Sequence, residues 1–305
     1  MFELNEEYLI ENVRQYVEKN ITLLIVGPQM DERTKSVHTE LNNDVDCVRI
    51  EYLYEEAKFK IIYEKSMIPM EAMPLDLGKR LANLTNYGVD FRNVLLDITS
   101  LQVPSIMSIL RTMKMEEYCK PAKLFTAYAK PEKYLYDNKK KYFFTSKFSE
   151  PASVPGFVSR IKENEVLIPF LGFEGSRIKN IIGEEQFKEV RPIIGFPSDD
   201  PMWQFETMKY CMEAIQEQRA ESYIEKCKAN SIFEAYYLLE KITRRNTGKN
   251  YVIAPLGTKP HSVAAVLFAL QHSKDCRIIY DYAIENYETS CGVHNIVVTH
   301  VSFFL

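Results

Sequence analysis

A polar loop between an apolar run and an apolar helical segment carries the residues best suited to bind a ligand. The loop contains Gly257, Thr258 and Lys259; residues 251–254 precede it and residues 262–270 follow it. A strand, a glycine-containing loop and a helix start form the phosphate-binding geometry of doubly wound α/β folds. Glycine lets backbone approach a ligand, threonine can cap the helix, and lysine adds positive charge. We expect an anion to bind here; an ordinary β–α turn with a solvated lysine is the alternative.

The residue after Pro260 is a histidine with two possible roles. Proline suits the first helical turn because its missing N–H has no intrahelical acceptor there. His261 would then lie in that first turn. It could contact a ligand or act as an acid or base, or it could be a surface histidine without a specific role.

A second candidate segment follows the predicted strand at residues 166–170. It contains two glycines, a carboxylate, a hydroxyl and a guanidinium: Gly172, Glu174, Gly175, Ser176 and Arg177. Glu174 could bind a ribose diol or act as an acid or base, and Arg177 could pair with phosphate. A glycine-rich turn with a capping serine is the alternative. The spacing is not G-x-G-x-x-G, so no dinucleotide fingerprint is present.

Two further polar loops follow predicted strands. Asp97, Thr99 and Ser100 close the strand at residues 94–98, and Asp199 follows the strand at residues 190–196. Strand ends are favourable positions for ligand contacts or for a catalytic carboxylate. Helix capping by these side chains is the alternative interpretation of both loops.

Metal binding and nucleophilic catalysis find little support. Cys291, His294 and His300 lie near one another in sequence without the spacing of a zinc ligand set. No G-x-S-x-G is present. We predict no metal and no dedicated cofactor, with a nucleotide-type ligand as the bound species.

The elements that must position these loops alternate between strand and helix. Alternation of this kind indicates a parallel sheet with right-handed crossovers. The apolar periodicity predicts strands at residues 21–26, 46–54, 94–98, 123–128, 166–170, 190–196, 251–254, 277–282 and 295–304. It predicts helices at residues 5–20, 31–41, 77–84, 104–115, 176–182, 202–226, 232–244 and 262–270. The predicted fold class is α/β, with two Rossmann-like halves and mainly parallel sheets.

A charged and proline-containing stretch before residue 156 marks the predicted domain boundary. We predict an N-terminal half at residues 1–148 and a C-terminal half at residues 149–305, with a helical insertion at about residues 200–246. The two halves echo each other. Gly27 and Arg33 after the first strand parallel Gly172 and Arg177. The stretch from residue 94 to residue 105 likewise parallels residues 251–262. The repeat predicts two copies of one fold sharing a ligand cleft.

Composition limits the classes of partner. The chain has 305 residues, is 46% hydrophobic and carries a net charge of −4. This charge argues against a nucleic-acid polymer as partner. The six cysteines are scattered, the N-terminus is acidic, and no apolar run reaches the roughly 18 residues of a membrane helix. We therefore predict a cytoplasmic protein with no membrane partner.

The two loops at strand ends resemble those of CRISPR-associated Rossmann fold (CARF) proteins and their SAVED relatives. The matching stretches run from Asp97 to Ser100 and from Leu256 to Lys259. The resemblance implies two fused Rossmann-like units that sense an oligonucleotide signal in prokaryotic antiviral defence. It also implies that five residues contact the ligand: Thr99, Ser100, Gly257, Thr258 and Lys259. The first loop differs from the family pattern, because it lacks the glycines and the lysine.

Three functions remain open at this point. The first is a module that binds a nucleotide or another phosphorylated small molecule. The second is a hydrolase or transferase acting on a nucleotide, nucleoside or sugar phosphate, with Glu174, Asp97 or Asp199 as acid or base and His261 assisting. The third is a structural subunit that contacts a protein partner through residues 202–244.

Overall fold

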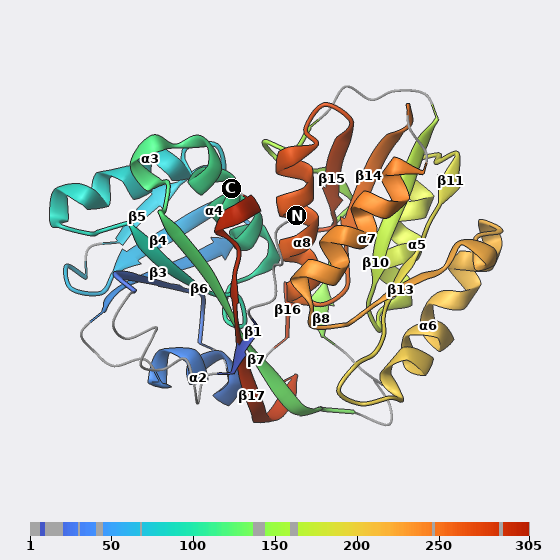
Figure 1. Cartoon of the computed structure of the whole chain (residues 1–305), viewed down its shortest axis with the longest axis horizontal. Coiled ribbons are helices and arrows are strands. Elements are labelled where there is room, and N and C mark those ends of the chain that lie inside the picture. The colour runs from blue at the N-terminus through green and yellow to red at the C-terminus, as the bar shows by residue number, and fades with distance from the viewer. Residues whose placement is uncertain are drawn as a thin grey trace. The chain divides into compact units, whose positions relative to one another are not determined.

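The chain folds into two compact units (Figure 1). The structure is a computed structural model that describes residues 7–9, 21–29, 31–40, 45–67, 69–136, 144–158, 164–245, 248–286 and 289–304. Unit 1 comprises Met1–Asn138 and Asn286–Leu305, and unit 2 comprises Lys139–Glu285. The division falls earlier than the predicted boundary after residue 148, and the last stretch of the chain belongs to unit 1.

Unit 1 is built on an eight-stranded sheet with a parallel core. Its strands, in sheet order, are β1 (Glu7–Leu9), β17 (Ser290–His300), β7 (Lys123–Tyr134), β6 (Asn93–Asp97), β2 (Leu23–Val26), β3 (Asp46–Leu53), β4 (Lys58–Tyr63) and β5 (Pro69–Ala72). The central strands β7, β6, β2 and β3 are parallel. Antiparallel strands extend the sheet at both edges.

Helices cover both faces of this sheet. They are α2 (Glu32–Glu40), α3 (Leu77–Asn83) and α4 (Val103–Met115), with short 3₁₀ turns η1 (Leu84–Tyr87), η2 (Glu117–Cys119) and η4 (Ser302–Phe304). The crossovers β2–α2–β3 and β6–α4–β7 run in opposite directions along the sheet. Right-handed crossovers therefore place α2 and α4 on opposite faces. A buried apolar cluster joins Val37 of α2 to side chains of β2, β6, β7 and β17.

Unit 2 has the strand order of a doubly wound fold. Its main sheet runs β13 (Glu225–Cys227), β12 (Ile193–Gly195), β10 (Glu165–Leu171), β14 (Asn250–Pro255), β15 (Cys276–Tyr280) and β9 (Ala152–Ser153), and β11 (Glu189–Val190) also pairs with β10. Only β9 is antiparallel among these strands of the described chain. A separate ribbon joins β8 (Thr145–Lys147) to β16 (Ile284–Glu285). Every residue of β10 and β14 is buried, as expected for strands covered on both faces.

The helices of unit 2 form two pairs. They are α5 (Gly175–Glu184), α6 (Trp203–Glu217), α7 (Ile232–Arg244) and α8 (Lys259–Gln271), with a 3₁₀ turn η3 (Glu221–Tyr223). Helix α5 packs on α6, and α7 packs on α8. The chain moves from β10 to β13 through α5 and α6 and then returns to β14 through α7. Right-handed crossovers place the two pairs on opposite faces, and α7 and α8 lie in front of the sheet in Figure 1.

The structure confirms the predicted α/β class and corrects three of the expected elements. The helix expected at residues 202–226 ends at Glu217, because Arg219 takes a left-handed φ of 53°, and Glu225–Cys227 forms β13 inside the stretch taken for a helical insertion. The last strand pairs with β7 of unit 1, so it does not complete the second half. Glu7–Leu9 is a strand, and the rest of the helix expected at residues 5–20 lies outside the described residues.

None of the helices in the described ranges is both long enough and apolar enough to cross a bilayer.

Candidate functional site

Each unit has one pair of neighbouring parallel strands from which the chain continues to helices on opposite faces of the sheet. We call the point between these two strands the switch point. That point lies between β2 and β6 in unit 1 and between β10 and β14 in unit 2. Doubly wound folds bind ligands outside the carboxyl ends of the strands at this point. A glycine follows the first strand in each case, Gly27 in unit 1 and Gly172 in unit 2. A β-carbon on Gly172 would lie 2.6 Å from the carbonyl oxygen of Leu256, and one on Gly27 would overlap the carbonyl of Ser100.

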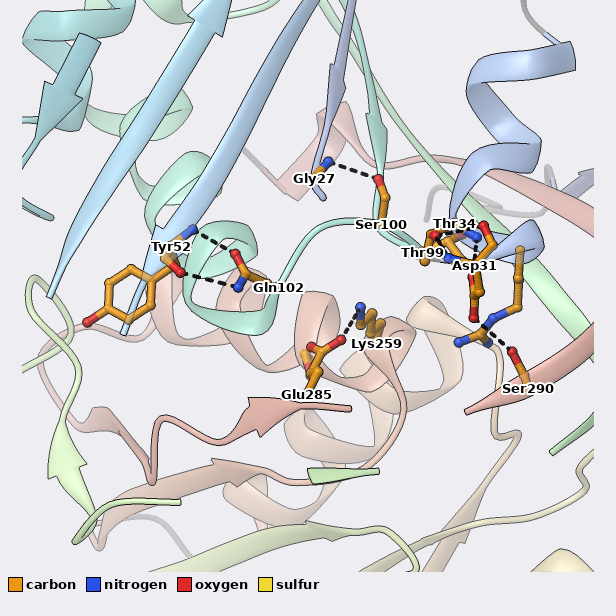
Figure 2. A network of polar contacts seen from close by, with 12 residues as sticks. Gly27, Asp31, Thr34, Tyr52, Thr99, Ser100, Gln102, Lys259, Glu285 and Ser290 are labelled. Atoms are coloured by element: carbon orange, nitrogen blue, oxygen red, sulfur yellow. Dashed lines mark hydrogen bonds and ion pairs between the residues drawn. The ribbon is translucent and has the colours of Figure 1, made fainter. Parts of the chain in front are cut away.

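In unit 2 the predicted loop opens helix α8 at this point. Thr258 is the N-cap; its hydroxyl accepts from the N–H of His261 at 3.4 Å and donates to the carbonyl of Ala229 at 2.5 Å. Lys259 begins the helix and Pro260 lies in its first turn. The Lys259 ammonium lies 3.1 Å from the carboxylate of Glu285, and its side chain is 15% exposed (Figure 2). The hydroxyl of Thr258 therefore organises the loop, while the cation of Lys259 already has an anionic partner.

His261 is fully buried behind this loop. Its Nε2 lies 3.0 Å from the carbonyl oxygen of Lys228 and 3.5 Å from the sulfur of Cys227. Because a carbonyl only accepts, Nε2 must carry the proton and Nδ1 is an acceptor; Nδ1 has no hydrogen-bond partner in the described structure. Burial lowers the pKa of His261 to about 4, which the Lys228 carbonyl only partly offsets. The imidazole is neutral near pH 7 and packs on Phe170.

Glu174 and Arg177 bind partners within unit 2. The carboxylate of Glu174 accepts from the N–H groups of Phe144 and Thr145 at 3.2 and 2.9 Å, and from the Thr145 hydroxyl at 2.8 Å. Arg177 donates two parallel bonds to Asp281, at 2.7 and 2.6 Å. Burial alone lowers the pKa of Arg177, but Tyr280, Asp281 and Glu174 outweigh it and raise this pKa above its ordinary value. A phosphate at Arg177 would have to displace Asp281.

The other residues of this segment have different surroundings. A β-carbon added to Gly175 would overlap the carbonyl of Tyr210, so this glycine permits the close packing of α5 on α6. Ser176 is exposed in the first turn of α5. Glu174 is the N-cap of α5, although its side chain makes no capping bond. A carboxylate at this helix start repels a bound anion, so α8 is the better phosphate site in unit 2.

In unit 1, Asp97, Thr99 and Ser100 form a closed turn. The carboxylate of Asp97 is fully buried and accepts from the N–H of Thr99 at 3.0 Å and from the Ser100 hydroxyl at 2.6 Å. Burial raises the pKa of Asp97 to about 6, against the lowering effect of these hydrogen bonds. Thr99 accepts from the N–H of Ala129 at 2.8 Å, and Ser100 accepts from the N–H of Gly27 at 2.9 Å (Figure 2). The turn holds β2, β6 and β7 together.

Sequence reasoning missed three residues that make polar contacts near these loops: Gln102, Asp281 and Glu285. Gln102 accepts from the N–H of Tyr52 at 2.6 Å and donates to its carbonyl at 3.2 Å, where β3 continues past the end of β2 (Figure 2). Asp281 and Glu285 follow the last parallel strand of unit 2. Because strand ends are favourable positions for ligand contacts, this position in the sequence could have identified them.

The remaining predicted positions lie on loops and helices of unit 2. Asp199 accepts from the side chain of Asn230 at 2.7 Å, which links the loops after β12 and β13. Residues 202–244, the predicted protein-binding stretch, include four exposed large hydrophobic side chains: Met202, Phe205, Tyr223 and Tyr237.

One group of side chains in unit 1 has the donor types of a metal site. His38, Cys47 and Glu64 place one ligand atom each within 4.8 Å of one another. The Glu64 carboxylate also lies 3.0 Å from Arg49 and 3.6 Å from His38. Burial raises the pKa of the Cys47 thiol, and Glu64 raises it further. A metal ion here would have to deprotonate this thiol and compete with Arg49.

Comparisons with known proteins add no family: no family model matches the chain, and no curated protein is similar to it.

Three of the four predicted acids and bases are held by groups of their own unit. Of the predicted acids and bases, Asp97 and Glu174 accept several hydrogen bonds from their own unit, and His261 is enclosed in the core. A general base must reach the proton that it removes. The helix start at the switch point of unit 2 carries a lysine and first-turn N–H groups, which suit an anion that can displace Glu285 from the lysine.

Proposed function

We propose that this protein binds a nucleotide or another phosphorylated small molecule at the start of helix α8. The observation that carries the proposal is the position of this helix start, directly after β14 at the switch point of a doubly wound sheet. First-turn N–H groups lack intrahelical acceptors and point out of the helix end, where they favour negative charge.

Three features make this end more suitable than the start of α5. Lys259 supplies a cation in the first residue of the helix. A β-carbon on Gly257 would lie 3.3 Å from the carbonyl oxygen of Leu171, so glycine keeps the loop open at the strand ends. The start of α5 instead carries the carboxylate of Glu174. Phosphate therefore binds at α8, in competition with Glu285 for the lysine.

The resemblance of these loops to CARF and SAVED proteins adds the ligand class that we test first. It supports a nucleotide signal, and a role in sensing such a signal in prokaryotic defence. In this proposal Gly257 allows the ligand close to the backbone, Gly172 allows the close approach of the Leu256 carbonyl, Lys259 binds a phosphate group, and Thr258 holds the loop in place.

Native mass spectrometry of protein purified from its host tests the ligand class, since a co-purifying nucleotide would be detected by its mass. Titration calorimetry with AMP and with inorganic phosphate then tests the site. We expect Lys259→Ala to weaken binding about tenfold or more, as loss of a charge-assisted hydrogen bond predicts.

The matched control is Lys274→Ala, an exposed lysine beyond the other end of α8. It should bind both probes as the unaltered protein does. Equal affinity of Lys259→Ala and the unaltered protein would remove α8 from the site and overturn the proposal.

A further inference from the structure

The two units place an arginine in corresponding positions. Arg33 lies on α2, which follows the first strand of the parallel core in unit 1, and Arg177 lies on α5, which follows the first parallel strand of unit 2. Each guanidinium lies against a tyrosine of the last parallel strand of its unit. The carbon Cζ of Arg33 is 5.9 Å from the ring centre of Tyr128, and that of Arg177 is 5.4 Å from the ring centre of Tyr280.

The two arginines differ in their charge partner. In unit 2 the residue after the tyrosine is Asp281, which binds Arg177 through two parallel hydrogen bonds. In unit 1 the residue after the tyrosine is Ala129, which has no side-chain oxygen. Arg177 therefore has a neighbouring carboxylate that neutralises it, and Arg33 has none at the corresponding position.

The contacts of Arg33 leave donor capacity unused. Its Nη1 donates to the hydroxyl of Tyr128 at 3.5 Å, and its Cζ lies 5.8 Å from the ring centre of Tyr134. Its Nε is buried and has no hydrogen-bond partner among the described residues. Leaving a buried donor without an acceptor costs free energy, which a bound acceptor would recover.

The carboxylate of Asp31, at the same helix start, is already occupied. Asp31 accepts from the N–H of Thr34 at 2.8 Å and from the hydroxyl of Ser290 at 3.4 Å (Figure 2). It contributes to the raised pKa of Arg33 from a distance, together with Tyr128 and Tyr134, although burial acts in the opposite direction. No ion pair within 4 Å joins Arg33 to an acidic side chain in the described part of the chain.

We propose that Arg33 binds an oxyanion, a carboxylate or a phosphate group, in the role that Asp281 has for Arg177. The guanidinium fork offers Nε and a terminal nitrogen to two oxygens of one group, as it does in unit 2. Arg33 lies in the first turn of α2, whose dipole favours an anion, while the carboxylates of Asp31 and Glu32 at the same helix start oppose one. Tyr128 and Tyr134 border the guanidinium, and their side chains also hydrogen-bond each other.

This site goes beyond the ligand site at α8, because it lies in unit 1 and uses no residue of that site. The full-length Lys259→Ala variant is therefore the background for its test, so that phosphate at α8 contributes less. Thermal unfolding is followed with increasing inorganic phosphate, with increasing acetate, and with sodium chloride at matched ionic strength. Comparison of the first two salts distinguishes a phosphate site from a carboxylate site.

We expect one of the two anions to raise the melting temperature beyond the chloride reference, and Arg33→Gln to abolish this increase. Arg80→Gln, at an exposed position on α3 of the same unit, should keep it. An increase of the same size in Arg33→Gln, or no increase with either anion, would overturn the proposal. If Arg33→Gln does not fold, Arg33→Lys tests the proposal instead. Lysine keeps the charge but lacks the planar fork of arginine, so we expect the anion to bind about tenfold more weakly. Unchanged anion binding in Arg33→Lys would contradict the proposal.

Discussion

Gly172 and Leu256 lie so close that the strand ends at the switch point of unit 2 leave no room for a side chain at position 172. A β-carbon there would lie 2.6 Å from the carbonyl oxygen of Leu256. Gly27 has the same relationship to the carbonyl of Ser100 in unit 1. The two units thus share this close backbone approach as well as the arrangement of their strands. In both, a glycine lets the end of the first strand approach the loop that follows the strand across the switch point.

Gly172→Ala is expected to destabilise the protein by about 1–3 kcal/mol, the range for overpacking a buried contact. The backbone carbonyl of Leu256 cannot rotate away as a side chain could, so the strand ends must separate. Chemical denaturation measures the effect. Gly183→Ala, within α5, is the control; nothing lies within 4 Å of its added β-carbon. It should stabilise the helix by about 0.5–1 kcal/mol, and equal effects of the two variants would contradict the prediction.

Short patterns in the sequence contain several of the observed helix starts. Thr258 caps α8 with Pro260 in its first turn, Ser231 caps α7 through the N–H of Glu234, and Asp31 caps α2. These features depend on residues within one turn of each other, so a short pattern contains them. The polar loops after β6, β10 and β14 follow from the same local reading.

Long-range pairing could not be predicted in the same way. β13 has only three residues, which is too few for the alternation of a strand to be recognised. The sequence of β17 predicts a strand but does not indicate that this strand pairs with β7. The partners of Arg177 show the same limit: Asp281 is 104 positions away in the chain. A sequence identifies a guanidinium near a glycine loop, but only the fold shows whether a carboxylate already holds it.

Asp281→Asn is expected to destabilise unit 2 by about 3–5 kcal/mol. The change removes one charge of a buried pair and leaves the Arg177 guanidinium without its counter-charge. Denaturant unfolding of the variant measures this loss. Glu240→Gln, which breaks the exposed pair with Arg244, is the control and should cost less than about 0.5 kcal/mol. Similar losses in the two variants would mean that the buried pair carries no special weight.

Glu285→Gln is expected to strengthen phosphate binding at α8. Glu285 holds the Lys259 ammonium at 3.1 Å, and a neutral amide would compete less for it. The gain in affinity should be about two- to fivefold, the value of a partly exposed ion pair. Titration calorimetry with inorganic phosphate measures it. Glu221→Gln, on η3 of the same unit, is the control and should leave affinity unchanged; weaker binding in Glu285→Gln would show that the carboxylate helps to hold the ligand.

His261 should make the protein less stable as the pH falls from about 6.5 to about 4. Its ordinary pKa is 6.5, and burial lowers the pKa in the folded protein to about 4. Between these values the unfolded chain binds a proton that the folded chain does not, so the free energy of unfolding decreases with decreasing pH. The full contribution is present above pH 6.5 and amounts to about 3 kcal/mol over the whole interval.

Asp97 acts in the opposite direction over part of this range, because burial raises its pKa from 3.8 to about 6. Its folded form binds the additional proton, so its contribution to stability is lost as the pH rises toward 6. The measurement therefore compares the unaltered protein with His261→Gln by chemical denaturation between pH 4.5 and 8, because the effect of Asp97 cancels in the difference. The difference should shrink as the pH falls. His294→Gln, at an exposed position, should follow the unaltered protein; a difference for His261→Gln that stays constant with pH would mean that this histidine is not held neutral by the fold.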